Sequence, residues 1–296
     1  MQFDQTSIAI RERSTLEVFD LAANVLVRHL QPIMVLLFLN AMPFVILDYY
    51  LINWMTDVSF SVELSTAYYV AMLALIVSQA QLGTCLITIF MGRVMFLDEY
   101  SVRAVLRQFL KRLPYFLYSQ GILRLAFFAV LLAMFTSPKD TEAAHIAAWL
   151  GLPAIATLGF LIRAIRPFVP EVIYLEQTAL KSKNDLPSLG LRSSNLHTLA
   201  AGAITMQFLS MALFAPLLLL AVHSVFVMAD SMFSIRANSE ISLQPFYILA
   251  AGWLVAGFLA VVRFLLYIDV RIRQEGWAVD LKFRSENTLL RQSRES

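Results

Sequence analysis

Six apolar stretches dominate the chain, and each is long enough to cross a lipid bilayer as a helix. A span needs about 20 mostly apolar residues, because a helix rises about 1.5 Å per residue across roughly 30 Å of hydrocarbon. We predict six spans, at about 32–54, 66–91, 114–135, 144–165, 199–226 and 245–268. The predicted fold class is therefore an all-α integral membrane protein, since six buried core helices in a soluble chain of 296 residues explain the pattern less well.

Amphipathic segments precede the first, third and fifth predicted spans. They occupy residues 14–30, 101–113 and 186–199. In the first segment Leu16, Phe19 and Leu26 share one helical stripe. Ser14 followed three residues later by Glu17 is a capping-box pattern, which predicts that a helix begins there. We expect such segments to be elbow helices that lie in the membrane interface before the chain turns into the bilayer.

The three elbow segments are evenly spaced. Their predicted starts, Ser14, Ser101 and Ser188, lie 87 residues apart each time. This spacing predicts a three-fold repeat of one elbow helix plus a transmembrane hairpin. Two tandem repeats with an unrelated hairpin fit the same spacing, and so does a coincidence of loop lengths.

Basic residues predict the orientation. Of the 23 lysines and arginines, only Lys139 and Arg236 fall in the three loops on one side, and only Arg124 lies well inside a span. Because cytoplasmic segments are enriched in lysine and arginine, both termini are predicted to be cytoplasmic. A single six-span membrane domain, 1–276, is then followed by an amphipathic cytoplasmic tail, 277–296.

Composition agrees with a membrane protein and excludes several other classes. Hydrophobic residues make up 59% of the chain and charged residues 15%, with a mean hydropathy of +0.68. Soluble domains carry about 25% charged residues. Cys85 is the only cysteine, so no disulfide framework exists, and a net charge of +2 is too small for nucleic-acid binding. We expect the partners to be membrane lipids with anionic headgroups at the cytoplasmic face, and a membrane-protein partner is a further option.

Catalytic and metal-binding motifs are missing from the sequence. No His-Glu-x-x-His, Gly-x-x-x-x-Gly-Lys-Ser/Thr or Gly-x-Ser-x-Gly motif occurs. The four histidines share no local ligand spacing; they are His29, His145, His197 and His223. We therefore predict a protein that is not an enzyme and that has no cofactor or metal.

Polar residues inside the predicted spans are the candidate site. Arg124 lies about 16 Å along the third span, where a charge is costly and should face the bundle interior. Its candidate partners are Asp48, Asn40, Gln79, Gln81 and Gln207. We expect Arg124 to reach towards Asp48. Two roles remain open: a structural polar cluster that fixes helix register, and a site for an anionic headgroup or substrate.

A motif at the end of the last span resembles a family signature. Its residues are Tyr267, Asp269, Arg271, Arg273, Glu275 and Gly276. The pattern Tyr-x-Asp-x-Arg-x-Arg-x-Glu-Gly is similar to that of a group of bacterial membrane proteins that includes the membrane domain joined to some glycerophosphodiester phosphodiesterases. Weaker similarities are the segment 16–29 and Glu176 followed by Leu191-Arg-Ser193. The resemblance implies a bacterial cytoplasmic (inner) membrane location and carries no catalytic residue.

The same motif has a direct physical interpretation. Asp269 and Arg273, and likewise Arg271 and Glu275, are four residues apart and can pair along a helix. Gly276 suits a left-handed helix cap. The motif either anchors the helix end or binds an anionic lipid headgroup or a partner.

The sequence predicts function only in outline. The leading hypothesis is a non-catalytic membrane protein that binds or moves lipid-like or amphiphilic molecules, or that scaffolds a membrane system. The alternative is a secondary transporter of a small solute, although no pair of Gly/Pro-broken half-helices stands out. An intramembrane enzyme ranks third, because no convergent acid–base pair is visible.

Overall fold

The structure is a computed structural model that describes residues 14–52, 62–97, 101–136, 146–176, 188–237 and 244–295. Within these ranges the regular structure is helical and no strand occurs, as the predicted fold class requires. The elements are α1 (Thr15–Arg28), α2 (Leu30–Ile52), α3 (Val62–Gly83), α4 (Cys85–Leu97), α5 (Val102–Phe116), the π-helical turn η3 (Leu117–Ile122), α6 (Ala126–Thr136), the π-helical turn η4 (Ala147–Gly151), α8 (Leu152–Ile165), α9 (Val169–Tyr174), α10 (Leu189–Ala237) and α11 (Gln244–Glu295).

Four helices are long and apolar enough to cross a membrane. They cover Leu30–Ile52, Thr66–Met95, Ile204–Met232 and Phe246–Arg273. A fifth is added if the bent pair Val102–Ile122 and Ala126–Thr136 counts as one span. The predicted third span, 114–135, is therefore broken rather than straight. The predicted fourth span, 144–165, corresponds to the shorter apolar helix Trp149–Ile165.

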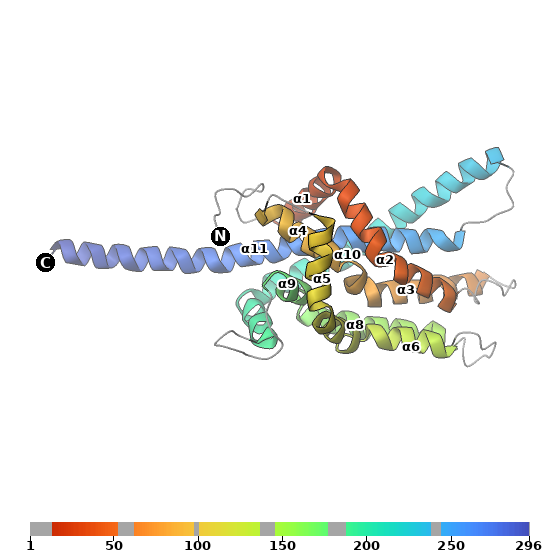
Figure 1. Ribbon diagram of the computed structural model, residues 1–296, viewed down its shortest axis with the longest axis horizontal. Helices are drawn as coiled ribbons and strands as arrows, with labels where there is room; N and C mark the ends of the chain where they lie inside the picture. Colours follow the sequence, from red (N-terminus) through yellow and green to blue (C-terminus); the bar gives the residue numbers. More distant parts are fainter. Residues whose placement is uncertain are drawn as a thin grey trace.

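Helix α11 is the centre of the bundle. It contacts α10, α3, α1, α4 and α2, and in Figure 1 it runs through the body of the molecule and continues beyond it to the C-terminus. Two glycines allow the neighbouring helices to approach closely. A Cβ atom at Gly252 would lie 2.7 Å from the Ile76 side chain, and one at Gly257 would lie 2.9 Å from Leu37.

Helix α10 lies on the outside of the bundle. No residue in the most apolar stretch of Ile204–Met232 is buried by the rest of the chain. Apolar side chains such as Leu213 and Leu217 are exposed along it. In Figure 1 its end diverges from the other helices. A helix that is apolar on all sides and not covered by protein is typical of one that contacts lipid.

Helices begin at the three predicted elbow starts. The first helical residue follows directly after Ser14, Ser101 and Ser188. In α1 the predicted capping box is present: the Glu17 N–H donates to Ser14 Oγ (3.3 Å), and the Ser14 N–H donates to Glu17 Oε2 (3.0 Å). A helix start at each serine is thus observed, whereas the repeat as a whole stays a prediction.

The buried face of α1 is rotated from the predicted stripe. Val18, Phe19, Ala22 and Val25 are buried against the bundle, whereas Leu16 is 71% exposed. A helix next to lipid can leave apolar side chains uncovered by protein, so hydrophobicity alone does not identify the face that packs on the protein.

Two other expectations about helix boundaries are wrong. Helix α10 is continuous, so the third elbow, 186–199, is not separated from the span that follows it. Gly276 does not end a helix, because α11 continues through it to Glu295 and no described glycine has a positive φ. The predicted tail, 277–296, is therefore a helical extension of the last span as far as Glu295.

Candidate functional site

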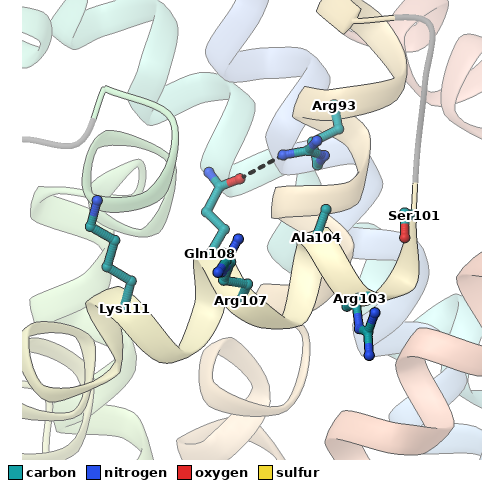
Figure 2. Close-up of a pocket in the computed structure, with 7 residues that line it drawn as sticks. All are labelled: Arg93, Ser101, Arg103, Ala104, Arg107, Gln108 and Lys111. Carbon is teal, nitrogen blue, oxygen red and sulfur yellow. Dashed lines mark hydrogen bonds between the residues drawn. The ribbon is translucent and has the colours of Figure 1, made fainter.

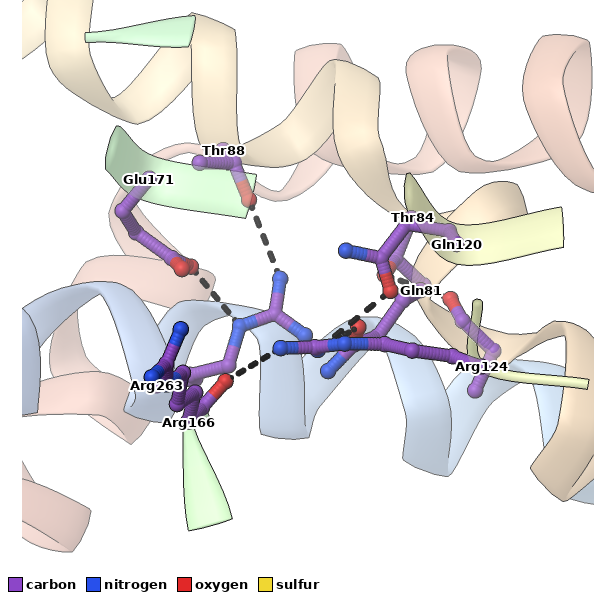
Figure 3. A network of polar contacts seen from close by, with 9 residues as sticks. Gln81, Thr84, Thr88, Gln120, Arg124, Arg166, Glu171 and Arg263 are labelled. Carbon is purple, nitrogen blue, oxygen red and sulfur yellow. Dashed lines mark hydrogen bonds and ion pairs between the residues drawn. The ribbon is translucent and has the colours of Figure 1, made fainter. Parts of the chain in front are cut away.

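Three arginines from three different segments converge in the interior. Arg124 lies at the break between η3 and α6, Arg163 lies in α8 and Arg263 lies in α11. Their exposed fractions are 5%, 5% and 8%. Figure 3 shows Arg124 and Arg263 extending towards each other. A buried charge is costly unless it is paired and hydrogen-bonded, so the partners of these three side chains define the site.

The broken helix positions Arg124. Leu125 has φ of 65°, a left-handed conformation that costs a leucine about 1–2 kcal/mol, and the two helical parts differ in direction by 64°. The bend lets Arg124 Nη1 donate to Gln81 Oε1 (2.9 Å) and Gln120 Oε1 (3.4 Å), while Nη2 donates to the Arg166 carbonyl. The strained backbone at Leu125 therefore helps to determine where the Arg124 guanidinium group lies.

Arg163 links the break to helix α3. Its guanidinium donates to the carbonyls of Val77 and Ser78 (2.6 Å to Ser78) and to the Arg124 carbonyl (3.3 Å). These are hydrogen bonds from a charged donor to neutral carbonyl oxygens, which are stronger than those between uncharged groups. Gly159, one turn earlier in α8, allows this approach, because a Cβ atom there would lie 3.0 Å from the Arg124 carbonyl oxygen.

Glu171 supplies the negative charge of the site. It is 0% exposed in α9 and accepts a hydrogen bond from Arg263 Nε (2.7 Å), while Arg263 Nη2 donates to Thr88 Oγ1 (3.3 Å). Glu171 Oε2 has no hydrogen-bond partner among the described residues. We call Arg124, Arg163 and Arg263 together with Glu171 the arginine cluster.

The arginine cluster carries more positive than negative charge. Three guanidinium groups face one carboxylate, which leaves an excess of two positive charges. The Coulomb interactions of Arg124 with Arg163 and Arg263, and of Arg163 with Arg263, are unfavourable. Hydrogen bonds to neutral amides and carbonyls hold the side chains without cancelling the charge. An anion placed among them would be held by charge-assisted hydrogen bonds.

A partly open cavity of about 400 Å³ lies beside the arginine cluster. Its walls come from α3, α8, α10 and α11 and are almost entirely apolar, with side chains such as Leu73, Phe160 and Met211. The lining residues nearest the C-terminal ends of α8 and α11 are Arg163 and Arg263, and Thr84, directly after α3, also lines the slot. We call this cavity the apolar slot; it has an apolar body and one cationic end. Its size is within the roughly 300–1,000 Å³ usual for ligand pockets.

Asp48 does not pair with Arg124, contrary to the prediction. Asp48 is 0% exposed, and its Oδ1 accepts a hydrogen bond from Gln79 Nε2 (2.8 Å). Arg124 is turned instead towards Gln81 and the Arg166 carbonyl. The reason is the break at Leu125, because the prediction measured depth along a straight helix.

The other two predicted polar residues have separate surroundings. Asn40 Nδ2 donates to the Leu82 carbonyl (2.8 Å), where α3 gives way to α4. Gln207 is buried in α10, and its Oε1 has no partner within the described ranges. The six predicted polar residues therefore form separate groups, and only Gln81 contacts Arg124.

The terminal motif meets an earlier part of the chain. Tyr267 Oη donates to Glu176 Oε1 (2.7 Å), Arg192 Nε donates to Glu176 Oε2 (2.6 Å), and Arg271 Nη1 lies 3.5 Å from Glu176 Oε1. Burial raises the pKa of the Glu176 carboxyl, but the hydrogen bonds from Arg192 and Tyr267 and the charges of Arg192 and Arg271 together outweigh it and leave the pKa below its ordinary value. We call these four residues the Glu176 cluster.

The remaining motif residues form one local pair. Asp269 Oδ2 accepts a hydrogen bond from Arg273 Nε (3.0 Å), which is the predicted four-residue spacing. The predicted pair of Arg271 with Glu275 lies outside the described side chains. Arg271 itself contacts Glu176 and Tyr267.

The fold and the site together define a class. An all-helical chain with four or five apolar helices of spanning length, and with a cationic cluster beside an apolar slot, is an arrangement suited to a membrane. Comparison with known proteins adds no narrower assignment: the chain matches no family model, no curated protein and no solved structure.

Sequence reasoning missed most of the arginine cluster. Arg163, Arg263, Glu171 and Gln120 were not selected as site residues. Arg163 and Arg263 were counted with the basic segments that follow their spans, although both lie inside the predicted span limits. The signal that could have found them is that three of the predicted spans each contain one arginine within their limits.

Proposed function

We propose that this is a non-catalytic integral membrane protein that binds or moves an amphiphilic molecule with an anionic group. The observation that carries the proposal is the apolar slot with Arg163 and Arg263 at one end. A hydrocarbon tail fits the apolar walls, and a carboxylate or phosphate fits the guanidinium end. Arginine is suited to this role because its planar group forms two parallel hydrogen bonds to such anions.

The position of α10 supports entry from the bilayer. One wall of the slot is made by α10 residues, among them Phe208, Pro216 and Leu219. Because no residue in the most apolar part of α10 is buried by the rest of the chain, the outer side of this wall is free to contact lipid. An amphiphile could pass sideways between α10 and its neighbours without crossing water.

We also propose six spans with both termini in the cytoplasm of a bacterium. Residues 114–135, which contain the break at Leu125, would be the third span, and η4 with α8 would be the fourth. The charge distribution supports the orientation, and the even spacing of the starts after Ser14, Ser101 and Ser188 supports a three-fold repeat.

Relationship to the glycerophosphodiester phosphodiesterase-associated membrane domain is part of the proposal. The residues that carry the resemblance come from separate places in the sequence, yet Tyr267, Arg271, Glu176 and Arg192 form the Glu176 cluster. Contacts among such residues support a shared structural role for them.

Secondary transport is the second candidate function. The favouring observation is the broken helix at Leu125, because transporters place broken helices beside their substrate sites. Unlike a simple binding protein, a transporter would accumulate the ligand in sealed vesicles when an ion gradient is applied.

The test compares two probes that differ only in head charge. Oleate and its uncharged methyl ester are titrated against the protein in phosphatidylcholine nanodiscs, and binding is followed by tryptophan fluorescence. Oleate should bind more tightly, and Arg263→Gln should remove most of the difference. Losing hydrogen bonds to a charged group costs about 1.5–3 kcal/mol, which corresponds to roughly 10–100-fold in Kd.

The matched control is Arg166→Gln. Arg166 is an exposed arginine near the cluster, and it contributes its backbone carbonyl, which the substitution keeps. This variant should retain the preference for oleate. Equal binding of the two probes by the unchanged protein would refute an anion-binding slot, as would an equal effect of the two substitutions.

A further inference from the structure

A second cavity, separate from the apolar slot, lies where the end of α4 meets α5. Its volume is about 680 Å³. Its lining residues, drawn in Figure 2, are Arg93, Ser101, Arg103, Ala104, Arg107, Gln108 and Lys111. Four of these seven residues are cationic and none is acidic, so we call the cavity the basic pocket.

Three of the cations lie on one face of α5. Arg103, Arg107 and Lys111 are each four residues apart, so they form a row about 12 Å long on the helix surface. All three are exposed. Among the described residues no carboxylate forms an ion pair with any of them. Like charges at this spacing repel one another, and no carboxylate in the described part of the chain offsets the repulsion through an ion pair.

Arg93 faces the row from α4. Its Nη1 donates to Gln108 Oε1 (3.5 Å), the contact drawn as a dashed line in Figure 2. Gln108 is held in turn, because its Nε2 donates to the Tyr174 carbonyl of α9 (2.8 Å). The buried Arg93 Nε has no partner among the described residues. The fourth cation is therefore held towards the row by an uncharged side chain.

The start of α5 differs from that of α1, the related elbow. At the N-terminus of α1 the backbone N–H groups of Glu17 and Ser14 donate to the side chains of Ser14 and Glu17. Ser101 precedes α5 but makes no capping hydrogen bond with its side chain, and the first turn has no acidic residue and contains Arg103. A helix N-terminus favours an anion and disfavours a cation. A bound anion would thus satisfy the backbone donors as well as the side chains.

We propose that the basic pocket binds a ligand with two or more phosphate-type anionic groups. The arginines hold phosphate oxygens through paired hydrogen bonds, Lys111 adds a point charge, and the first backbone N–H groups of α5 donate to a further oxygen. The row of cations is too long for one phosphate group, which spans only one turn of it. The source is either the headgroup of a lipid with two phosphates or a soluble phosphorylated molecule.

The experiment has two arms that distinguish these sources. The full chain is placed in phosphatidylcholine nanodiscs and titrated with inorganic pyrophosphate by calorimetry. In the second arm, native mass spectrometry of the detergent-solubilised protein measures the retention of cardiolipin, a lipid with two phosphates. Saturable pyrophosphate binding supports a soluble ligand, whereas selective cardiolipin retention without it supports a lipid headgroup.

Matched variants separate the pocket from general positive charge. Arg107→Gln is expected to weaken binding about tenfold or more in whichever arm shows it. Arg28→Gln removes one charge from an exposed position on α1, outside the basic pocket, and should change binding less than about twofold. Both substitutions are at exposed positions, so folding should be kept. No saturable binding in either arm, or equal loss in the two variants, would overturn the proposal.

Discussion

The substitution Glu171→Gln tests whether the arginine cluster is held by its single carboxylate. Glutamine keeps the size of the side chain and removes the charge that faces Arg263 at 2.7 Å. Both residues are almost fully buried. Removing one partner of a buried ion pair destabilises a protein by about 3–5 kcal/mol, because the remaining charge is left uncompensated.

Three guanidinium groups would then remain with no carboxylate among them. For a chain of this size each kcal/mol lowers the midpoint of thermal unfolding by roughly 2–4 °C, so a decrease on the order of 10 °C is expected. The measurement is thermal unfolding in detergent, followed by tryptophan fluorescence. The double substitution Glu171→Leu with Arg263→Met should recover most of the loss, since an apolar pair of similar volume is often as stable as a buried ion pair.

Measuring the thermal unfolding of Glu171→Gln with and without a ligand gives a second test. An anionic amphiphile in the apolar slot should stabilise Glu171→Gln more than it stabilises the unchanged protein, because the variant offers it one more unpaired cation. At a concentration of about 100 times Kd the ligand contributes roughly 2.7 kcal/mol. An unfolding midpoint within about 2 °C of the unchanged protein, together with no gain from the double substitution, would show that Glu171 does not hold the cluster.

Other substitutions and conditions give independent tests. Gly159→Ala should destabilise by about 1–3 kcal/mol, because its Cβ would crowd the Arg124 carbonyl at 3.0 Å; at Gly202 nothing lies within 4 Å, so Gly202→Ala should be neutral or slightly stabilising in the same unfolding assay. The lowered pKa of Glu176 contributes stability that is complete above the ordinary carboxyl pKa and is lost as pH falls through the pKa of the folded state. Between pH 7 and pH 3 the free energy of unfolding should therefore decrease less steeply for Glu176→Gln than for the unchanged protein. A reporter fused after Ser296 should be protected from external protease in intact cells, and cleavage would contradict the proposed orientation.

The sequence predicted the helical class, because long apolar runs leave few alternatives. It also predicted the starts after Ser14, Ser101 and Ser188, since a serine before an amphipathic run is a local signal. Local signals did not extend to tertiary contacts. Arg163 and Arg263 looked like the basic flanks of their spans, and only the packing of α8 and α11 on α3 shows that both are buried.

The error about Asp48 has a different origin. The prediction placed Arg124 by counting residues along an unbroken helix, and nothing in the stretch near Leu125 indicates a left-handed residue, because leucine rarely adopts that conformation. The compensating contacts come from Gln81, Arg163 and Arg166, which are distant in sequence. A strained position that is stabilised by distant residues is hard to predict from a single sequence.

The continuity of α11 turns the last helix into a lever. About 22 residues separate Arg273 from Glu295, so the part beyond the bundle is roughly 33 Å long at the rise of an α-helix. Arg263, at the cationic end of the slot, belongs to the same rod. If a ligand in the slot tilts α11 by about 5°, the tip of this extension moves by about 3 Å, and a partner protein that contacts the tip could respond to occupancy of the slot.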